Sequence, residues 1–306
     1  MKKPPPSRQS LTSTFLTQVL WGTLLFFIPS YTIAQQHDGT GFMVSIDAGA
    51  LFPSDKQANF YDGRDGRPNT ILRVLHSEAY GHSIWQSLKN GGYITDAVGS
   101  YTALTVDEWP DMYYKTSFQI GFGLRYGFRG GWGGLLRVDY ARLTAVGAWN
   151  LSATNGTGIL SDRGRYIRCG VYGLENRIMI DLGITKQFQI NDSWSIGIEG
   201  GIDINNTKVK EHEMEIAGRR YSILDIWDGA SPSAGTGSYE YINQGGIGYG
   251  YFSTLVISYG IPGYGSLDLG FSCYYTQTRY PDYNDDDAFA VQNVLFLRAN
   301  LYNFFF

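Results

Sequence analysis

Ten charged residues of this 306-residue sequence lie at alternate positions within runs whose intervening residues are mostly apolar. Alternate residues of a β-strand point to opposite faces, so these charges would share one face while the apolar side chains share the other. The set is Asp47, Arg125, Arg137, Asp139, Arg177, Asp181, Glu199, Asp203, Asp268 and Arg298. Arginines and carboxylates confined together should pair, because an unpaired buried charge is costly. The pattern predicts a structural network of ion pairs, with a path for protons or small ions as the alternative.

Other motifs that could carry chemistry are weak. None of the four histidines, His37, His76, His82 and His212, lies on a predicted membrane-spanning strand, which disfavours a Ser/His site facing lipid. The sequence "EHEME" lacks the two spaced histidines of a zinc motif and is expected to extend a strand. The run "DYNDDD" lacks the Gly and the distant Glu of an EF-hand and is expected to be a solvated loop. We therefore expect no metal, no cofactor and no catalytic residue.

The elements that must position these charges are β-strands. The run "RIMIDLGITKQFQI" from Arg177 alternates, a short "NDS" turn follows, and "WSIGIEGGIDI" alternates again. Two alternating runs joined by a tight turn indicate a β-hairpin. Eight such runs occur along the chain, at 42–52, 117–127, 136–140, 177–190, 194–204, 249–260, 267–275 and 295–305. Cys169 is expected in a loop and Cys273 on an apolar strand face, so no disulfide is expected.

The lengths of the connections separate two classes of all-β protein. Connections between the second and third, fourth and fifth, and sixth and seventh runs are a few residues long, and most of the others are long. Sorted connections are typical of outer-membrane barrels, whose short turns face the periplasm and whose long loops face outside. A soluble sandwich also alternates but has no reason to sort its loops. Aromatic residues gather at both ends of the runs, as in the girdles of such barrels.

The N-terminal segment indicates export. Residues 1–34 hold the cations Lys2, Lys3 and Arg8, a ten-residue apolar run, and a small-residue pattern ending at Ala34. This layout predicts a signal peptide at 1–34 and a mature barrel at 35–306, with an N-terminal membrane anchor as the alternative. The net charge of −4 and the absence of a basic stripe argue against nucleic acid as a partner.

The first long connection, from about 53 to 113, is expected to be structured because it far exceeds the usual loop length. Apolar residues at helical spacing from Ile71 to Leu75 and from Tyr80 to Leu88, followed by Gly91-Gly92, predict one or two short helices at the extracellular mouth.

The chain ends in "LYNFFF", which suits a strand that closes a barrel and anchors its aromatic residues at the membrane boundary. With the signal peptide and the eight alternating runs, this ending resembles the small OmpA/OmpX-type outer-membrane β-barrels. That resemblance implies an eight-stranded antiparallel up-and-down transmembrane barrel. It also implies that Phe306, with Tyr302 and Phe304, is recognised by the barrel-assembly machinery. The alternation places Phe305, not Phe306, toward lipid.

The expected function follows from the width of such a barrel. Eight strands enclose a lumen that side chains can fill, so an open channel is not expected. We expect a non-enzymatic protein of the cell outer membrane, in contact with its lipid, whose extracellular loops bind a partner or serve a structural role in the envelope. One alternative is an accessory component of a protein-secretion and gliding apparatus, because in size and layout the chain is also similar to PorT-type barrels. The other is a small lipid-modifying enzyme.

Overall fold

The computed structural model describes residues 40–64, 70–154, 156–160, 166–223, 245–261, 264–280 and 289–302. Eight antiparallel strands of these residues form a closed ring, in which each strand pairs with its neighbours in the chain and the last pairs with the first. This confirms the predicted eight-stranded up-and-down barrel. The barrel strands are β1 (Gly41–Phe52), β4 (Ser117–Gly127), β5 (Trp132–Ala153), β6 (Ile167–Gln189), β7 (Trp194–Ile216), β9 (Gly245–Ile261), β10 (Gly265–Gln277) and β11 (Phe289–Tyr302).

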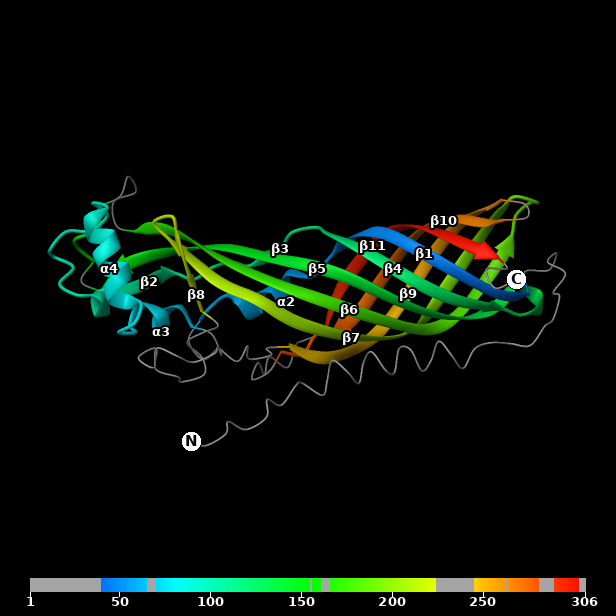
Figure 1. Ribbon diagram of the computed structural model, residues 1–306, viewed down its shortest axis with the longest axis horizontal. Helices are drawn as coiled ribbons and strands as arrows, with labels where there is room; N and C mark the ends of the chain where they lie inside the picture. Colours follow the sequence, from blue (N-terminus) through cyan, green and yellow to red (C-terminus); the bar gives the residue numbers. More distant parts are fainter. Residues whose placement is uncertain are drawn as a thin grey trace, which may run out of the picture. The chain divides into compact units, whose positions relative to one another are not determined.

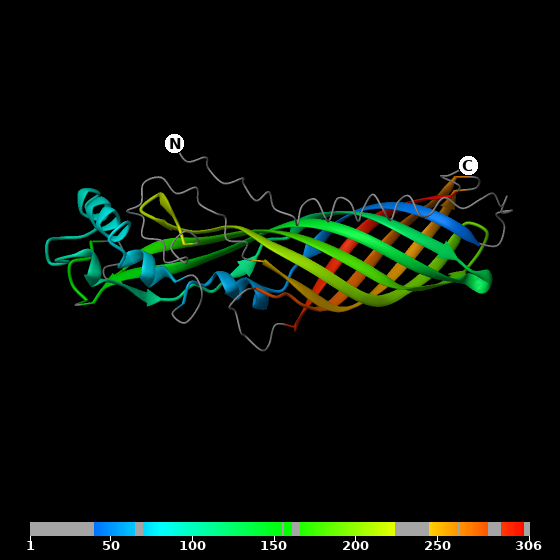
Figure 2. The same cartoon turned by 60° about the horizontal axis from the view of Figure 1, so that its bottom comes forward.

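The ring closes between β1 and β11. Ten residue pairs join the two strands, from Met43 opposite Tyr302 to Phe52 opposite Asn293. Figures 1 and 2 show β1 in blue beside β11 in red, so the first and last strands of the barrel are neighbours in the wall. Closure pairs the backbone groups of both strands on both sides, which a sheet in hydrocarbon requires. Tyr302 is the last residue of β11, and the predicted signal residues Phe304 and Phe306 lie outside the described residues.

Short turns join strands at one end of the barrel, as predicted. Between β6 and β7, the Asn191 side chain accepts hydrogen bonds from the backbone N–H groups of Ser193 and Trp194 at 3.0 and 2.9 Å. Between β4 and β5, a 3-10 turn, η3 (Arg129–Gly131), places Gly130 and Gly131 at φ 76°. Residues with side chains rarely adopt this conformation, which accounts for the glycine pair.

Three strands are longer than the alternation predicts. Strands β5, β6 and β7 have 22, 23 and 23 residues, about twice the number that a tilted strand needs to cross a membrane. The expected long loops after the third and fifth runs are therefore partly strand, and β7 includes "EHEME" as expected. The expectation of Cys169 in a loop is wrong, because the residue lies on β6 and pairs with Trp149 of β5. Both cysteines are free.

The extended strands carry a folded unit beyond the barrel, at its end with the long connections (Figure 1). We call it the cap: the described parts of 70–114, 141–176 and 205–223. Its added elements are α3 (Ile71–Leu75), α4 (Gly81–Asn90), η2 (Tyr101–Ala103), β2 (Leu104–Glu108), β3 (Tyr113–Tyr114) and β8 (Arg219–Ser222). The two predicted helices are confirmed; Thr70 caps α3 by accepting from the Arg73 N–H at 3.1 Å.

The cap has its own apolar core. Strands β2 and β3 pair with β5, and β8 pairs with β7, which widens the sheet on either side. The helices pack against it, and the fully buried side chains include Leu75, Ile84, Leu88, Trp149 and Val171. Ahead of α3, the segment that leaves β1 forms α2 (Asp55–Ala58) and the 3-10 turn η1 (Asn59–Tyr61). None of the described helices has the length and hydropathy to span a bilayer.

Candidate functional site

All ten charged residues singled out in the sequence lie on the inward face of the barrel. Nine of them are buried, and Arg125 keeps 12% of its side chain exposed. They come from all of the barrel strands except β9, so the ring brings together residues up to 251 positions apart, from Asp47 to Arg298. The alternation of the strands is what turns these side chains inward.

Arg137 of β5 is held by two carboxylates, a phenol and two aromatic rings. Its Nε lies 3.0 Å from Asp181 Oδ2 and 3.1 Å from Asp139 Oδ2. Its Nη2 donates to the Tyr274 hydroxyl at 2.7 Å, and that hydroxyl donates to Asp181 Oδ2 at 2.9 Å. The guanidinium carbon lies 5.6 and 5.5 Å from the ring centres of Phe252 and Phe296. The cation is therefore both paired and stacked across the lumen.

Glu199 of β7 is the carboxylate that contacts the largest number of arginines in the lumen. Arg298 donates to both of its oxygens, at 2.8 and 3.3 Å, and Arg125 donates to Oε1. Arg137 Nη1 lies 3.9 Å from Oε2. Three cations from β4, β5 and β11 thus meet one anion in the middle of the lumen. Paired burial of this kind offsets the cost of removing each charge from water.

Several acids of the lumen lack a full set of partners. Asp203 accepts from Asn205 and Thr276, and Asp268 from Ser266 and Asn300. Asp203 Oδ1, Asp47 Oδ2 and both oxygens of Asp139 have no hydrogen-bond donor among the described residues, although Asp139 Oδ2 lies 3.1 Å from Arg137 Nε. The Asp47 and Asp139 carboxyls crowd Gly121, where an added Cβ would lie 1.9 Å from Asp139 Oδ1 and 2.6 Å from Asp47 Oδ1. The glycine leaves the space that these two carboxyls occupy.

A second cluster closes the barrel at the cap end. Arg177 Nη2 donates to Glu175 Oε1 at 2.6 Å, and its Nη1 donates to the side-chain oxygens of Gln57 and Gln292 at 3.0 and 2.9 Å. Glu175 Oε2 accepts from the hydroxyls of Tyr61 and Tyr280, both at 2.8 Å. Gln57 and Tyr61 come from the segment that leaves β1, so this segment fills the mouth of the lumen.

The mouth cluster is buried outside the membrane-spanning part. Burial, and then the Glu175 carboxylate, raise the pKa of Tyr61 and of Tyr280 well above the usual value, so both phenols donate to Glu175 at neutral pH. His212 of β7 lies against Tyr61, with Nε2 3.1 Å from the Tyr61 carbonyl oxygen. Burial lowers the pKa of His212 to about 4. The ring is therefore neutral near pH 7, and Nε2–H donates to the carbonyl.

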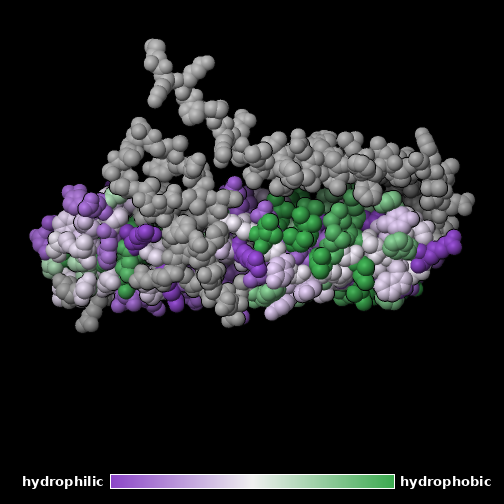
Figure 3. Space-filling view, turned by 90° about the horizontal axis from the view of Figure 1, so that it is seen from below, coloured by the Kyte–Doolittle hydropathy of each residue, from purple (hydrophilic) through white to green (hydrophobic). Residues whose placement is uncertain are grey.

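The outward face of the barrel is an apolar belt. Each barrel strand exposes at least one large apolar side chain at mid-height: Ile46, Phe122, Leu136, Leu182, Ile198, Leu255, Leu269 and Leu297. Figure 3 shows hydrophobic residues gathered along the barrel. Exposed aromatic residues flank the belt at both ends, with Trp132, Trp194 and Tyr259 near the short turns and Tyr140, Tyr249 and Tyr275 toward the cap. An apolar surface that encircles a closed ring is stable only in lipid.

The fold is that of a small outer-membrane β-barrel. The belt lies in the lipid of the outer membrane. In proteins of this architecture the short turns face the periplasm, so the cap of this chain faces the cell exterior.

No protein-family model matches the sequence, and no curated protein matches it. Among solved structures, Neisserial surface protein A is 9% identical, covering 86% of this chain and 97% of its own, with a TM-score of 0.34. OprG from Pseudomonas aeruginosa is 8% identical, with coverages of 87% and 98% and a TM-score of 0.37. Ail, the attachment invasion locus protein of Yersinia pestis, is 10% identical, with coverages of 86% and 100% and a TM-score of 0.33.

Several site residues are absent from the sequence prediction. Tyr274 alternates inward on β10 but carries no charge, so a search for charged positions passes over it. Glu175 lies above the lipid belt, where the alternation of apolar residues ends. Tyr61 and Gln57 belong to a connection, and nothing in their neighbourhood indicates that they enter the lumen.

Proposed function

We propose that the protein is a non-enzymatic outer-membrane barrel with a lumen filled by side chains. The barrel anchors a folded cap that binds a partner outside the cell. The observation that carries this proposal is the continuity of β5, β6 and β7 from the lipid belt into the cap. A surface built on continuous strands is held in place before it meets a partner. Binding then costs less conformational entropy than binding by a loop that must first become ordered.

The contents of the lumen favour an anchor over a channel. Glu199 with its three arginines lies across the middle of the barrel, and the Glu175 cluster closes the cap end. An eight-stranded ring leaves only the width that such side chains fill. We therefore assign the lumen charges a structural role, in which they keep the wall rigid beneath the cap.

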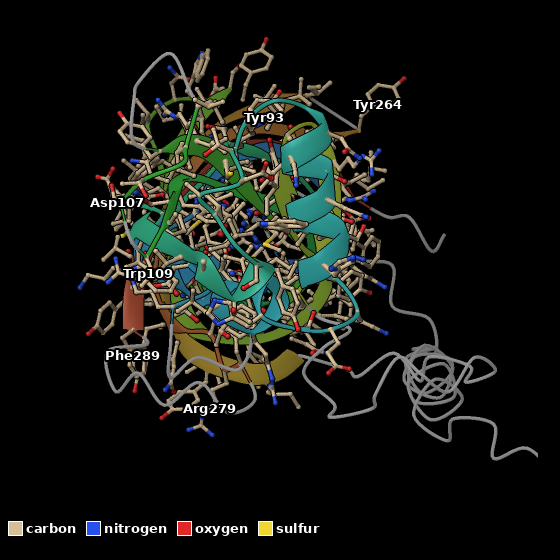
Figure 4. All side chains as sticks on the ribbon, turned by 90° about the vertical axis from the view of Figure 1, so that its left-hand side faces the viewer. Tyr93, Asp107, Trp109, Tyr264, Arg279 and Phe289 are labelled. Carbon is tan, nitrogen blue, oxygen red and sulfur yellow. The ribbon has the colours of Figure 1, made fainter. Side chains whose placement is uncertain are left out.

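The end of the cap that faces away from the membrane carries both aromatic and acidic side chains. Figure 4 looks onto this end and shows Tyr93, Asp107 and Trp109 at its periphery. Tyr93 and Asp107 are exposed, and Trp109 is half-buried. Aromatic residues are enriched in protein interfaces because they bury a large area at a small cost in entropy. These residues mark the part of the cap that we expect a partner to contact.

An accessory role in a secretion or gliding apparatus would use the same cap and would differ only in the identity of the partner.

A lipid-modifying enzyme would need a base that faces the lipid. The described histidines, His76, His82 and His212, all lie in the cap rather than on the belt. This placement favours the binding role.

The experiment is affinity purification of the full-length protein from envelopes. Each captured protein is then purified and tested for direct binding. The double variant Tyr93→Ser/Asp107→Ser should lose the partner. Tyr264→Ser should keep it, because Tyr264 is 75% exposed at a short turn of the opposite end. A subunit of a secretion machine among the re-bound partners would favour the accessory role. Equal capture by the two variants would contradict the assigned surface, and altered envelope lipids in a deletion strain would contradict the non-enzymatic role.

A further inference from the structure

Exposed cations border the lipid belt on its cap side. Arg142 lies on β5, Lys208 on β7, and Arg279 two residues after the end of β10. All three side chains are exposed. We call these three residues the basic row. They occupy a part of the wall that the lumen network, the mouth cluster and the proposed partner surface leave unused.

Strand register places two members of the basic row directly above the belt. Arg142 lies opposite Asn176 of β6, which lies opposite Lys208. One step nearer the membrane, Tyr140 lies opposite Ile178, and both are exposed on the belt. Arg142 and Lys208 are two strands apart, so their backbones are separated by about 10 Å. One phosphate-bearing headgroup, or two adjacent ones, can span that separation.

Arg279 extends the row toward β9 and β10. Its guanidinium carbon lies 5.6 Å from the ring centre of Tyr249, an exposed aromatic residue of the cap-side girdle. In Figure 4 its side chain points away from the barrel wall. Stacking over the ring holds the cation at the height where the girdle ends. Among the described residues, no carboxylate forms an ion pair with Arg279, Arg142 or Lys208. Their charge is therefore available to an outside anion.

We propose that Arg142, Lys208 and Arg279 bind the phosphate groups of lipid headgroups in the outer leaflet. The headgroup layer begins where the apolar belt ends, so every embedded molecule brings this layer against the basic row. Cations at that height attract anionic headgroups over about a Debye length. A soluble phosphate or an acidic polymer would lack this continuity with the belt. The row would fix the depth of the barrel and the orientation of the cap above the membrane.

The test is native mass spectrometry of the full-length folded protein released from mixed micelles of phosphatidic acid and phosphatidylcholine. We expect preferential retention of phosphatidic acid. The variant Arg142→Gln/Lys208→Gln/Arg279→Gln should retain about a hundredfold less, which is about fivefold for each cation removed. The control Arg73→Gln/Arg168→Gln/Arg219→Gln removes three exposed cap cations and should retain the wild-type amount. The conservative variant Arg142→Lys/Arg279→Lys should bind as the wild type does.

A single variant and a second probe test the same site independently of the triple variant. Arg279→Gln lies outside the strands, so it leaves the barrel intact and should lower retention about fivefold even if the triple variant fails to fold. Inorganic pyrophosphate is the second probe. Equal affinity for pyrophosphate and for phosphatidic acid would overturn the lipid as the ligand. Equal loss in the row variants and the cap control would overturn the assignment of the site.

Discussion

At the residue scale, the lumen is organised around unequal numbers of acids and arginines. Asp47, Asp139, Asp181, Glu199, Asp203 and Asp268 share the membrane-level lumen with Arg125, Arg137 and Arg298. Because Glu199 contacts all three arginines, it carries more of the pairing than any other acid. Asp203, by contrast, is held by an amide and a hydroxyl that both donate to Oδ2. The two acids should therefore differ sharply when their charge is removed.

The first prediction concerns that difference. Glu199→Gln leaves three buried cations without their shared anion and should destabilise the barrel by about 3–5 kcal/mol. Asp203→Asn can keep its oxygen toward both donors and should cost less than about 1 kcal/mol. The midpoint of the heat-induced gel shift, measured in detergent, compares the variants. Equal midpoints for Glu199→Gln and the wild type would show that the arginines do not depend on Glu199.

The second prediction concerns His212 and pH. Its pKa is about 4 in the folded protein, because burial disfavours the charged ring, against about 6.5 in an unfolded chain. The unfolded cap therefore binds more protons between these values. The contribution of His212 to the free energy of unfolding of the cap should be fully present above pH 6.5. It should decrease as the pH falls toward 4, by at most about 3 kcal/mol in total. Amide hydrogen exchange of the cap measures it. An identical pH profile in His212→Gln would contradict this origin.

The third prediction concerns the space beside Asp47 and Asp139. Gly121→Ala places a methyl group against both carboxyls and should destabilise the barrel by about 1–3 kcal/mol. Gly134→Ala is the matched control, since its added Cβ would have no atom within 4 Å. The gel-shift midpoint should fall for the first variant alone. A similar midpoint for both variants would mean that the two carboxyls move aside without cost.

At the element scale, the parts of the structure that the sequence predicts are those whose environment enforces a repeat. Lipid outside and charges inside require alternation, so "RIMIDLGITKQFQI" indicates its strand and its inward face without a template. In the cap, β5 continues as "TAVGAWNLSA" from Thr144, where residues on both faces are covered and the alternation is lost. Only pairing with β2 and β6 shows that this segment is strand. The mouth cluster depends on the same long-range pairing, which explains why Glu175 and Tyr61 are not predictable.

The fourth prediction separates the cap from the barrel. Leu88 of α4 is fully buried in the cap core, so Leu88→Ala should destabilise the cap by about 2–5 kcal/mol. The barrel should remain folded, because its strands are paired around the ring. Limited proteolysis of intact cells should therefore cleave the variant within 70–114, while the gel shift of the barrel stays normal. Leu160→Ala, at a residue 52% exposed, should resist proteolysis as the wild type does. Loss of the gel shift in Leu88→Ala would show that cap and barrel fold as one unit.

At the scale of the whole molecule, a closed wall with a filled lumen carries the cap. The ring removes every free sheet edge from the lipid. Its inward side chains join β4, β5, β7 and β11 through Glu199, and the segment after β1 closes the mouth. In the function that we propose, the filled lumen opposes the passage of ions and supports the cap.

We propose that the lumen is sealed to ions. Recording the ionic conductance of the purified full-length protein in planar bilayers tests this proposal. We predict at most small, rare openings in the wild type, with an increase in Glu199→Gln if that variant remains inserted. Large, stable, porin-like conductance from the wild-type protein would show that the lumen is open.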